Sequence, residues 1–152
     1  MDDMVYDNEW VVGEPEIKYW NKMDYLHQEE TREIIGICME VHRELGFGFL
    51  EAVYKDAIEY ELNLKNISYE REKLCKIRYK DIILKKTFNA DFFIFDKVML
   101  EVKAQRDFAE DNFGQTLNYL SASGCAVGLL VNFGKPSLQF RRLARTIKNK
   151  SI

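Results

Sequence analysis

The chain has 152 residues, of which 47% are hydrophobic and 13% aromatic, which suits one globular domain with a sizeable core. Its net charge of −3 argues against a strongly basic protein that coats DNA, and the longest apolar run, Cys125–Val131, is too short to cross a bilayer. Three widely spaced cysteines without a CxxC pair indicate reduced thiols, and the N-terminus lacks the layout of a signal peptide. We therefore expect a cytoplasmic protein without a membrane segment.

The two ends of the chain differ in charge. The first 33 positions hold ten acidic and three basic residues, whereas Phe133–Ile152 holds six basic residues and no acidic one. We interpret residues 1–28 as an acidic, partly ordered extension and residues 29–148 as the folded domain. The basic C-terminal segment could follow a phosphate backbone, although a solvated terminus has the same composition.

The periodicity of apolar residues predicts three helices and four strands. Two helices come first, at about Glu29–Leu45 and Leu50–Leu64, and a third lies at about Phe108–Ala122. The strands are expected at about Tyr69–Tyr79, Ile82–Phe95, Lys97–Ala104 and Cys125–Asn132, and Ser137–Lys148 is ambiguous between strand and helix. The order helix, helix, three-stranded meander, helix, strand predicts an α/β domain with a mixed central sheet flanked by helices.

The segment Asn89–Lys103 has an apolar pattern that folds back on itself about Asp96, which predicts a hairpin. One buried face then pairs Ile94 with Val98, Phe92 with Leu100 and Ala90 with Val102. The other face pairs Phe93 with Met99, Asp91 with Glu101 and Asn89 with Lys103. Directly opposed carboxylates within about 5 Å of each other require a cation, and a divalent metal with oxygen ligands meets that need. A solvated hairpin face is the alternative interpretation.

Several spaced motifs, in this order, resemble the GxxExxY proteins over about residues 30–145. They are Val41–Gly46, Gly48-Phe49-Leu50-Glu51-Ala52-Val53-Tyr54, Ala90-Asp91, Leu100-Glu101-Val102-Lys103-Ala104, Gln115 with Tyr119, and Val131–Gly134. That family is similar to a compact branch of the PD-(D/E)xK nuclease superfamily, which implies a restriction-endonuclease-like core. Two positions depart from the family pattern, since Phe47 replaces the usual proline and Asn89 stands where a basic residue is common.

The resemblance implies a metal site in the hairpin. Asp91 and Glu101 would bind one Mg²⁺ or Mn²⁺, joined by the Val102 carbonyl, and Lys103 would orient the attacking water or stabilise the transition state. Glu51 would reach the same site from the opposite wall, although a carboxylate at the start of a helix also stabilises the helix dipole.

Gln115 and Tyr119 are one helical turn apart and therefore share a helix face. The resemblance implies that they line the active site, whereas their polar face alone would indicate plain solvent exposure. The favoured function is a metal-dependent nuclease that binds nucleic acid, with DNA preferred over RNA. A nuclease fold kept as a non-catalytic accessory protein, which binds nucleic acid or a protein partner, is the alternative. A carboxylate-pair glycosidase would leave Lys103 without a role. The oligomeric state is open, and a homodimer is among the possibilities.

Overall fold

One mixed β-sheet organises the structure, a computed structural model that describes residues 4–6, 10–11 and 26–145. Its five main strands follow the order β7-β6-β5-β4-β3, and two short strands both pair with β7 at one edge. The strands are β1 Met4–Tyr6, β2 Trp10–Val11, β3 Tyr69–Tyr79, β4 Ile82–Ile94, β5 Val98–Lys103, β6 Val127–Asn132 and β7 Gln139–Arg145. The predicted α/β class and the predicted order of elements are confirmed.

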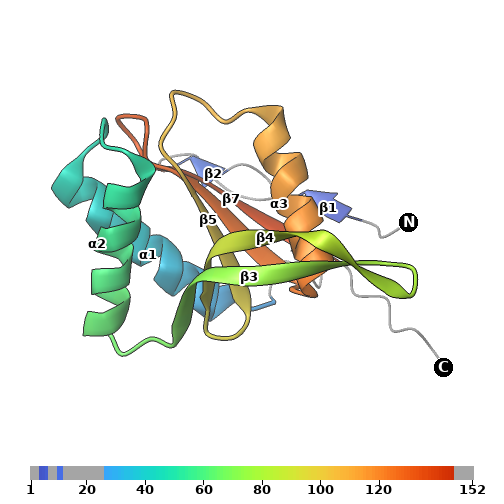
Figure 1. Ribbon diagram of the computed structural model, residues 1–152. Helices are drawn as coiled ribbons and strands as arrows, with labels where there is room; N and C mark the ends of the chain where they lie inside the picture. The colour runs from blue at the N-terminus through green and yellow to red at the C-terminus, as the bar shows by residue number, and fades with distance from the viewer. Residues whose placement is uncertain (1–3, 7–9, 12–25, 146–152) are drawn as a thin grey trace.

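Helices cover both faces of the sheet (Figure 1). Helices α1 (Gln28–Leu45) and α2 (Glu51–Leu64) bury their apolar residues against one face, and α3 (Glu110–Ser123) packs on the other. Each helix presents an apolar stripe at helical spacing, as the sequence predicted. Among the described residues, no helix has both the length and the hydropathy needed to cross a membrane.

The centre of the sheet is almost entirely buried. All six residues of β6 are buried, and β6 runs parallel to β5 in a register from Val98↔Val127 to Lys103↔Asn132. Because parallel neighbours require a crossover, α3 connects these two strands. The ambiguous C-terminal segment is a strand, β7, antiparallel to β6; residues 146–148 of the predicted domain lie outside the described residues.

The β4–β5 hairpin has the predicted register over its apolar half. The pairs Ile94↔Val98, Phe93↔Met99 and Phe92↔Leu100 are formed. Phe95 and Asp96 take φ values of 60° and 55°, and the Lys97 N–H donates to the Ile94 carbonyl, as in a type I′ turn. The pairing ends beyond Phe92 and Leu100, so Asp91 and Glu101 lie where the two strands part.

One predicted face assignment in this hairpin is wrong. Ala90 was expected beside Phe92 and Val102, but it packs in the cluster on the α3 side of the sheet, with Cys75 and Met99. Along β4, the alternation of side chains between the two faces of the sheet is interrupted at Asp91. The position across from Asp91 on β3 is Glu72, whose backbone has a φ of 54°. A non-glycine residue in the left-handed region inside a strand breaks the two-residue alternation, which explains the error.

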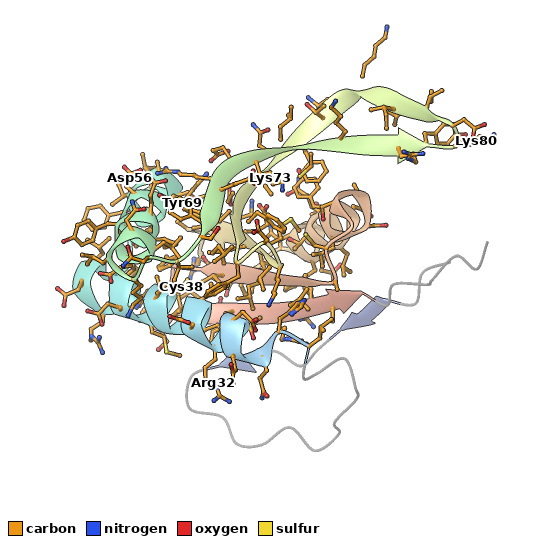
Figure 2. The ribbon with its side chains drawn as sticks, turned by 90° about the horizontal axis from the view of Figure 1, so that it is seen from below. Arg32, Cys38, Asp56, Tyr69, Lys73 and Lys80 are labelled. Atoms are coloured by element: carbon orange, nitrogen blue, oxygen red, sulfur yellow. The ribbon has the colours of Figure 1, made fainter. Side chains whose placement is uncertain are left out.

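Strands β3 and β4 form the longest hairpin and project beyond the body of the protein (Figures 1 and 2). The register shifts between Lys76 and Arg78, and the turn follows at Lys80 and Asp81. We refer to residues 76–87 as the outer ribbon. Most of its side chains are exposed, in contrast to those of residues 90–94. The outer ribbon thus extends the sheet past α3 without a core of its own.

Candidate active site

The carboxylates of Asp91 and Glu101 form the centre of the site, and we call them the carboxylate pair. Glu101 is 5% exposed, and the Asp91 side chain is 15% exposed. The Asp91 N–H donates to Glu101 Oε1 at 3.2 Å, and the Val102 N–H donates to Asp91 Oδ2 at 2.8 Å. These side-chain bonds replace the backbone pairing that ends at Phe92 and Leu100. The two carboxylates are therefore held in place by the main chain of the neighbouring strand.

Burial makes the charged form of Glu101 unfavourable. Desolvation and then the nearby charge of Asp91 raise the pKa of Glu101 to about 8, and the charge of Lys103 opposes this shift only in part. Glu101 accordingly holds a proton at neutral pH when only these protein groups surround it. A divalent cation between the two carboxylates would reverse the shift, because it favours the ionised form.

Lys55, which the sequence analysis did not single out, provides a positive charge at this site. Its Nζ lies 2.9 Å from Asp91 Oδ1 and also contacts the carboxylate of Glu72. Burial would lower the pKa of Lys55, but the hydrogen bonds and charges of Glu72 and Asp91 outweigh it and raise the pKa. A single cation from α2 thus joins acidic residues of β3 and β4.

Lys103 ends β5 and is half-buried. Its backbone carbonyl accepts a hydrogen bond from the Phe133 N–H at 2.8 Å, which fixes the end of the strand. Within the part of the chain that the structure describes, its ammonium forms no ion pair within 4.0 Å. The charge of Lys103 is therefore near Glu101 and available to a ligand.

The loop after β5 is tied to the loop after β6. The Asn132 side chain donates to the Gln105 carbonyl at 2.8 Å and accepts from the N–H groups of Gln105 and Gly134, each at 3.0 Å. A Cβ on Gly134 would collide with the Gln105 backbone. This close contact explains the glycine in the Val131–Gly134 motif and holds the chain next to Lys103.

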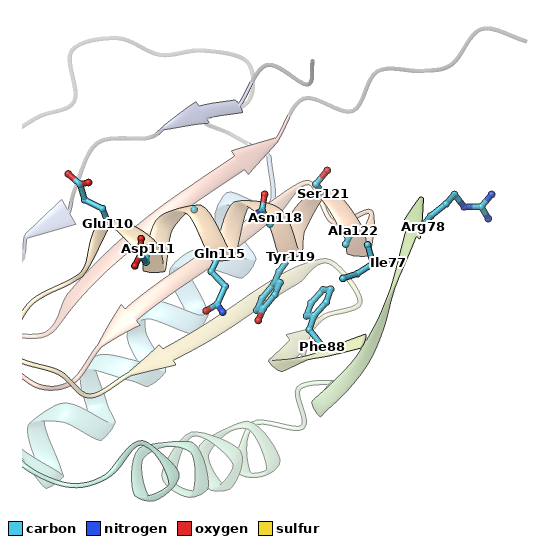
Figure 3. Close-up of a pocket in the computed structure, with 11 residues that line it drawn as sticks. Ile77, Arg78, Phe88, Glu110, Asp111, Gln115, Asn118, Tyr119, Ser121 and Ala122 are labelled. Carbon is cyan, nitrogen blue, oxygen red and sulfur yellow. The ribbon is translucent and has the colours of Figure 1, made fainter. Parts of the chain in front are cut away.

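Tyr119 and Gln115 lie on the exposed side of α3. Burial raises the pKa of Tyr119, and the charges of Glu101 and Asp91 add to that shift, so the phenol is within electrostatic reach of the carboxylate pair. The Tyr119 ring stacks on Phe88 of β4 with ring centroids 3.8 Å apart. Figure 3 shows Gln115 and Tyr119 on the same side of the helix, lining a groove of about 910 Å³ between α3 and the β3–β4 hairpin.

Glu51 is exposed in the first turn of α2 and shares a helix face with Lys55, four residues later. Across residues 4–6, 10–11 and 26–145, no group of three or more His, Cys, Asp or Glu side chains is arranged to hold a metal ion. The structure therefore brings Asp91 and Glu101 together but does not bring Glu51 into a three-acid cluster. The carboxylate pair offers hard oxygen donors, which suit Mg²⁺ or Mn²⁺.

Tyr54 has a structural place in the Gly48–Tyr54 motif. Its hydroxyl donates to the Gly46 carbonyl at 2.7 Å and accepts from the Phe49 N–H at 3.3 Å. Its ring is fully buried and stacks on Phe133 at 4.5 Å. The loop that precedes α2, in which Gly46 and Gly48 have positive φ, is thereby attached to the core, and this attachment sets the position of Glu51 and Lys55.

Comparison with known proteins gives one match. A family model described as "PD-(D/E)XK nuclease superfamily" matches residues 28–143, which extend from the first turn of α1 into β7 and include every site residue discussed above. No curated protein and no solved structure matches the chain. The α/β architecture, with a five-stranded mixed sheet flanked by helices, is consistent with the restriction-endonuclease-like fold of that superfamily.

Proposed function

The chain belongs to the PD-(D/E)XK nuclease superfamily, and we propose that it is a metal-dependent nuclease that hydrolyses phosphodiester bonds in DNA. The observation that carries this proposal is the carboxylate pair, which is buried where two strands part and is fixed by backbone hydrogen bonds. We further propose that the chain belongs to the GxxExxY branch of the superfamily, on the motifs quoted above.

Asp91, Glu101 and the Val102 carbonyl would hold one Mg²⁺ or Mn²⁺, which would supply positive charge for the scissile phosphate and the attacking water. Asp91 is already positioned by the Val102 N–H, so it needs little rearrangement before the ion binds. A bound cation would favour the ionised form of Glu101 and so offset the burial that raises its pKa.

Lys103 stabilises the negative charge that develops on the phosphate, or orients the water that attacks it. Its ammonium is close enough to Glu101 to influence the pKa of that carboxyl and has no fixed acidic partner among the described residues. A positive charge placed before the reaction costs no rearrangement during it. Gln115 and Tyr119 line the groove in which a nucleic-acid strand would lie, and Glu51 would contribute an acid from α2 through water.

Lys55 acts on the site when no metal is bound. It neutralises Asp91 and Glu72, which would otherwise repel each other across adjacent strands. A divalent cation at Asp91 would repel the ammonium and weaken this ion pair. We therefore assign Lys55 a charge-balancing role, in which it neutralises Asp91 and Glu72 until a metal replaces it at Asp91.

We place the catalytic domain at residues 29–148 and treat residues 1–28 as its extension, two segments of which, β1 and β2, pair with β7. The cytoplasm is the proposed location, on the composition of the chain.

The proposal is tested by incubating the purified protein with labelled DNA and RNA in Mg²⁺, Mn²⁺ or EDTA. We expect cleavage of DNA that requires the metal and is lost in Glu101→Gln, while Asp96→Asn, at the exposed turn of the same hairpin, cleaves like the parent. Binding without cleavage of any nucleic acid, in every metal, would instead support the accessory-protein alternative. That alternative has one structural argument, since Lys55 already neutralises Asp91 without a metal.

A further inference from the structure

The outer ribbon carries a strong local charge that is opposite in sign to that of the whole protein. It contains five basic residues and one acidic residue, in a chain whose net charge is −3. The basic residues are Lys76, Arg78, Lys80, Lys85 and Lys86, and the acidic one is Asp81. Figure 2 shows Lys80 at the tip of the ribbon and Lys73 nearer its base.

Most of these cations have no structural partner. Among the described residues, Lys76, Arg78, Lys85 and Lys86 form no ion pair within 4.0 Å, and Lys80 lies over the ring of Tyr79 at 5.4 Å. The ribbon also exposes large apolar side chains, with Ile82 58% and Ile83 50% exposed. Exposed cations and apolar groups on a projecting hairpin contribute little to the fold, so their placement indicates a partner surface.

The groove between α3 and the β3–β4 hairpin reaches the outer ribbon. Ile77 and Arg78 line one end of it, and Gln115 and Tyr119 line it from α3. Burial raises the pKa of Tyr119, and the charges of Glu101 and Asp91 add to that shift. Glu110 and Asp111 also line the groove, at the start of α3. A polyanion bound along the ribbon would therefore lie next to Gln115 and Tyr119, which we propose to line the nuclease site.

We propose that the outer ribbon is a binding arm for double-stranded DNA, which places the duplex across the carboxylate pair. The inference rests on the proposed nuclease function only for the position of the scissile bond. A two-stranded β-ribbon fits the major groove of B-form DNA, which is about 12 Å wide, whereas the major groove of A-form RNA is too narrow for side chains to read. The cations contact phosphates, and the apolar side chains contact thymine methyl groups.

The geometry sets the length of duplex that the arm needs. Ile82, next to the tip, is about nine residues along β4 from Asp91, which corresponds to roughly 30 Å of strand. At about 3.4 Å per base pair, that distance spans roughly nine base pairs. The arm therefore needs about nine base pairs of duplex on one side of the cleaved bond.

A second copy of this chain fits the ribbon less well than DNA does. If two outer ribbons packed against each other, the five basic residues of one would face the five basic residues of the other. Asp81 is the one acidic residue that each ribbon has to offset them. Opposed like charges destabilise a strand pair. The sign of the surface therefore favours a polyanion.

The test compares two triple variants that remove the same charge. Lys76, Lys85 and Lys86 are replaced by Gln in the ribbon variant, and three exposed residues outside the ribbon, Arg32, Arg43 and Lys65, are replaced by Gln in the control. Binding is measured by fluorescence anisotropy in EDTA, over a range of salt concentrations, with a 30-base-pair DNA duplex, the matching single strand and an RNA duplex as probes. Since EDTA prevents metal-dependent cleavage, binding is measured independently of the nuclease proposal.

We expect the ribbon variant to bind duplex DNA about 10- to 100-fold more weakly than the control, with a salt dependence smaller by up to about three counterions. DNA duplexes shorter than about nine base pairs should lose this difference between the variants. Equal binding by the two variants, or equally tight binding of single-stranded DNA or RNA duplex by the parent, would overturn the inference. So would loss of dimers, seen by light scattering, as the only effect of the ribbon variant. Loss of duplex binding in a protein that never cleaves would support the arm and refute the nuclease.

Discussion

The charged side chains in the two halves of β4 differ in sign and in the number of partners that they contact. The inner half carries Asp91, whose carboxylate accepts from the Val102 N–H and contacts Lys55. The outer half carries Lys85 and Lys86, which are exposed and form no ion pair within the described part of the chain. The inner acid is held in one position by its partners, whereas the outer cations can adapt to a ligand.

This difference follows from the position of each half in the sheet. The inner half is covered by helices on both faces, so an acid there must be hydrogen-bonded or neutralised. The outer half lies beyond the helices, where a solvated charge costs little. One strand can thus place a fixed chemical group and an adaptable binding surface about 30 Å apart at most.

Replacing Asp91 is expected to have the largest effect. Asp91→Asn removes a ligand charge and, with it, metal binding, so the cleavage rate should fall by at least about 1,000-fold. Rates of DNA cleavage, with the rise of Tm on adding Mn²⁺ as a second measurement, check this prediction. The matched control is Asp96→Asn, which changes an exposed acid in the same hairpin. If the ribbon variant reduced the maximal rate as much as Asp91→Asn does, chemistry would not be confined to the inner half.

Replacing Lys103 should separate catalysis from metal binding. In the proposed mechanism, Lys103→Ala removes a positive charge that would act on the reacting groups, so the cleavage rate should fall by about 100-fold. The Tm increase on adding Mn²⁺ should be retained, because Asp91 and Glu101 remain. Lys97→Ala, at the other end of the same hairpin, serves as the control. Parent-like cleavage by Lys103→Ala would contradict the assigned role.

Replacing Lys55 should affect the inner half in the opposite direction. In Lys55→Met, the metal no longer competes with an ammonium at Asp91, and we expect Mn²⁺ to bind about 10-fold more tightly. Without metal, the same variant should be less stable than the parent, because Asp91 and Glu72 lose their shared cation. Calorimetric titration gives the affinity, and Lys65→Met, at the residue that follows α2, is the control. Weaker binding would mean that the metal requires Lys55 to hold Asp91.

The smallest effect concerns the pH dependence of stability. The pKa of Glu101 in the folded state, about 8, is above its ordinary value of 4.5, so the folded state binds more protons between these two values. Stability therefore falls as the pH rises through that range. Glu101→Gln cannot ionise, and in EDTA at pH 8.5 we expect its Tm to exceed that of the parent by on the order of 5 °C.

At pH 3.5 or below, about one unit under the ordinary pKa, the Tm difference between Glu101→Gln and the parent should nearly vanish, because Glu101 is then mostly protonated in both states. The exposed Asp81, at the turn of the outer ribbon, provides the control through Asp81→Asn, which should show no such dependence. Identical pH profiles for Glu101→Gln and the parent would show that Glu101 is ionised in the folded protein.

Much of this arrangement could be predicted from the sequence, because the spacing of apolar residues determines which side chains can be buried together. The apolar pairs about Asp96 specified the β4–β5 register, since a shift by one residue would expose every buried side chain. The C-terminal strand was ambiguous because Arg142 is buried there, where its Nη2 donates to the Leu26 carbonyl. A charged residue inside a buried strand obscures the alternation on which such predictions depend.

Lys55 could not be predicted in the same way. Its partners Glu72 and Asp91 are 17 and 36 positions away in the chain, and only the tertiary packing of α2 against the sheet brings the three together. The positive φ of Glu72, which accompanies the misassigned face of Ala90, was likewise not indicated by the sequence. The predicted metal-binding and catalytic roles of Glu51, Asp91, Glu101, Lys103, Gln115 and Tyr119 remain predictions for the experiments above.

The pairing of β1 with β7 has a consequence for the order in which the protein folds. Met4 pairs with Arg145, so this contact closes nearly the whole described chain into one loop, whereas β3, β4 and β5 are joined by short turns. Closure of a long loop carries a greater entropic cost than closure of a hairpin. We expect the central meander to form early and the N-terminal strand to dock last, against a sheet already assembled.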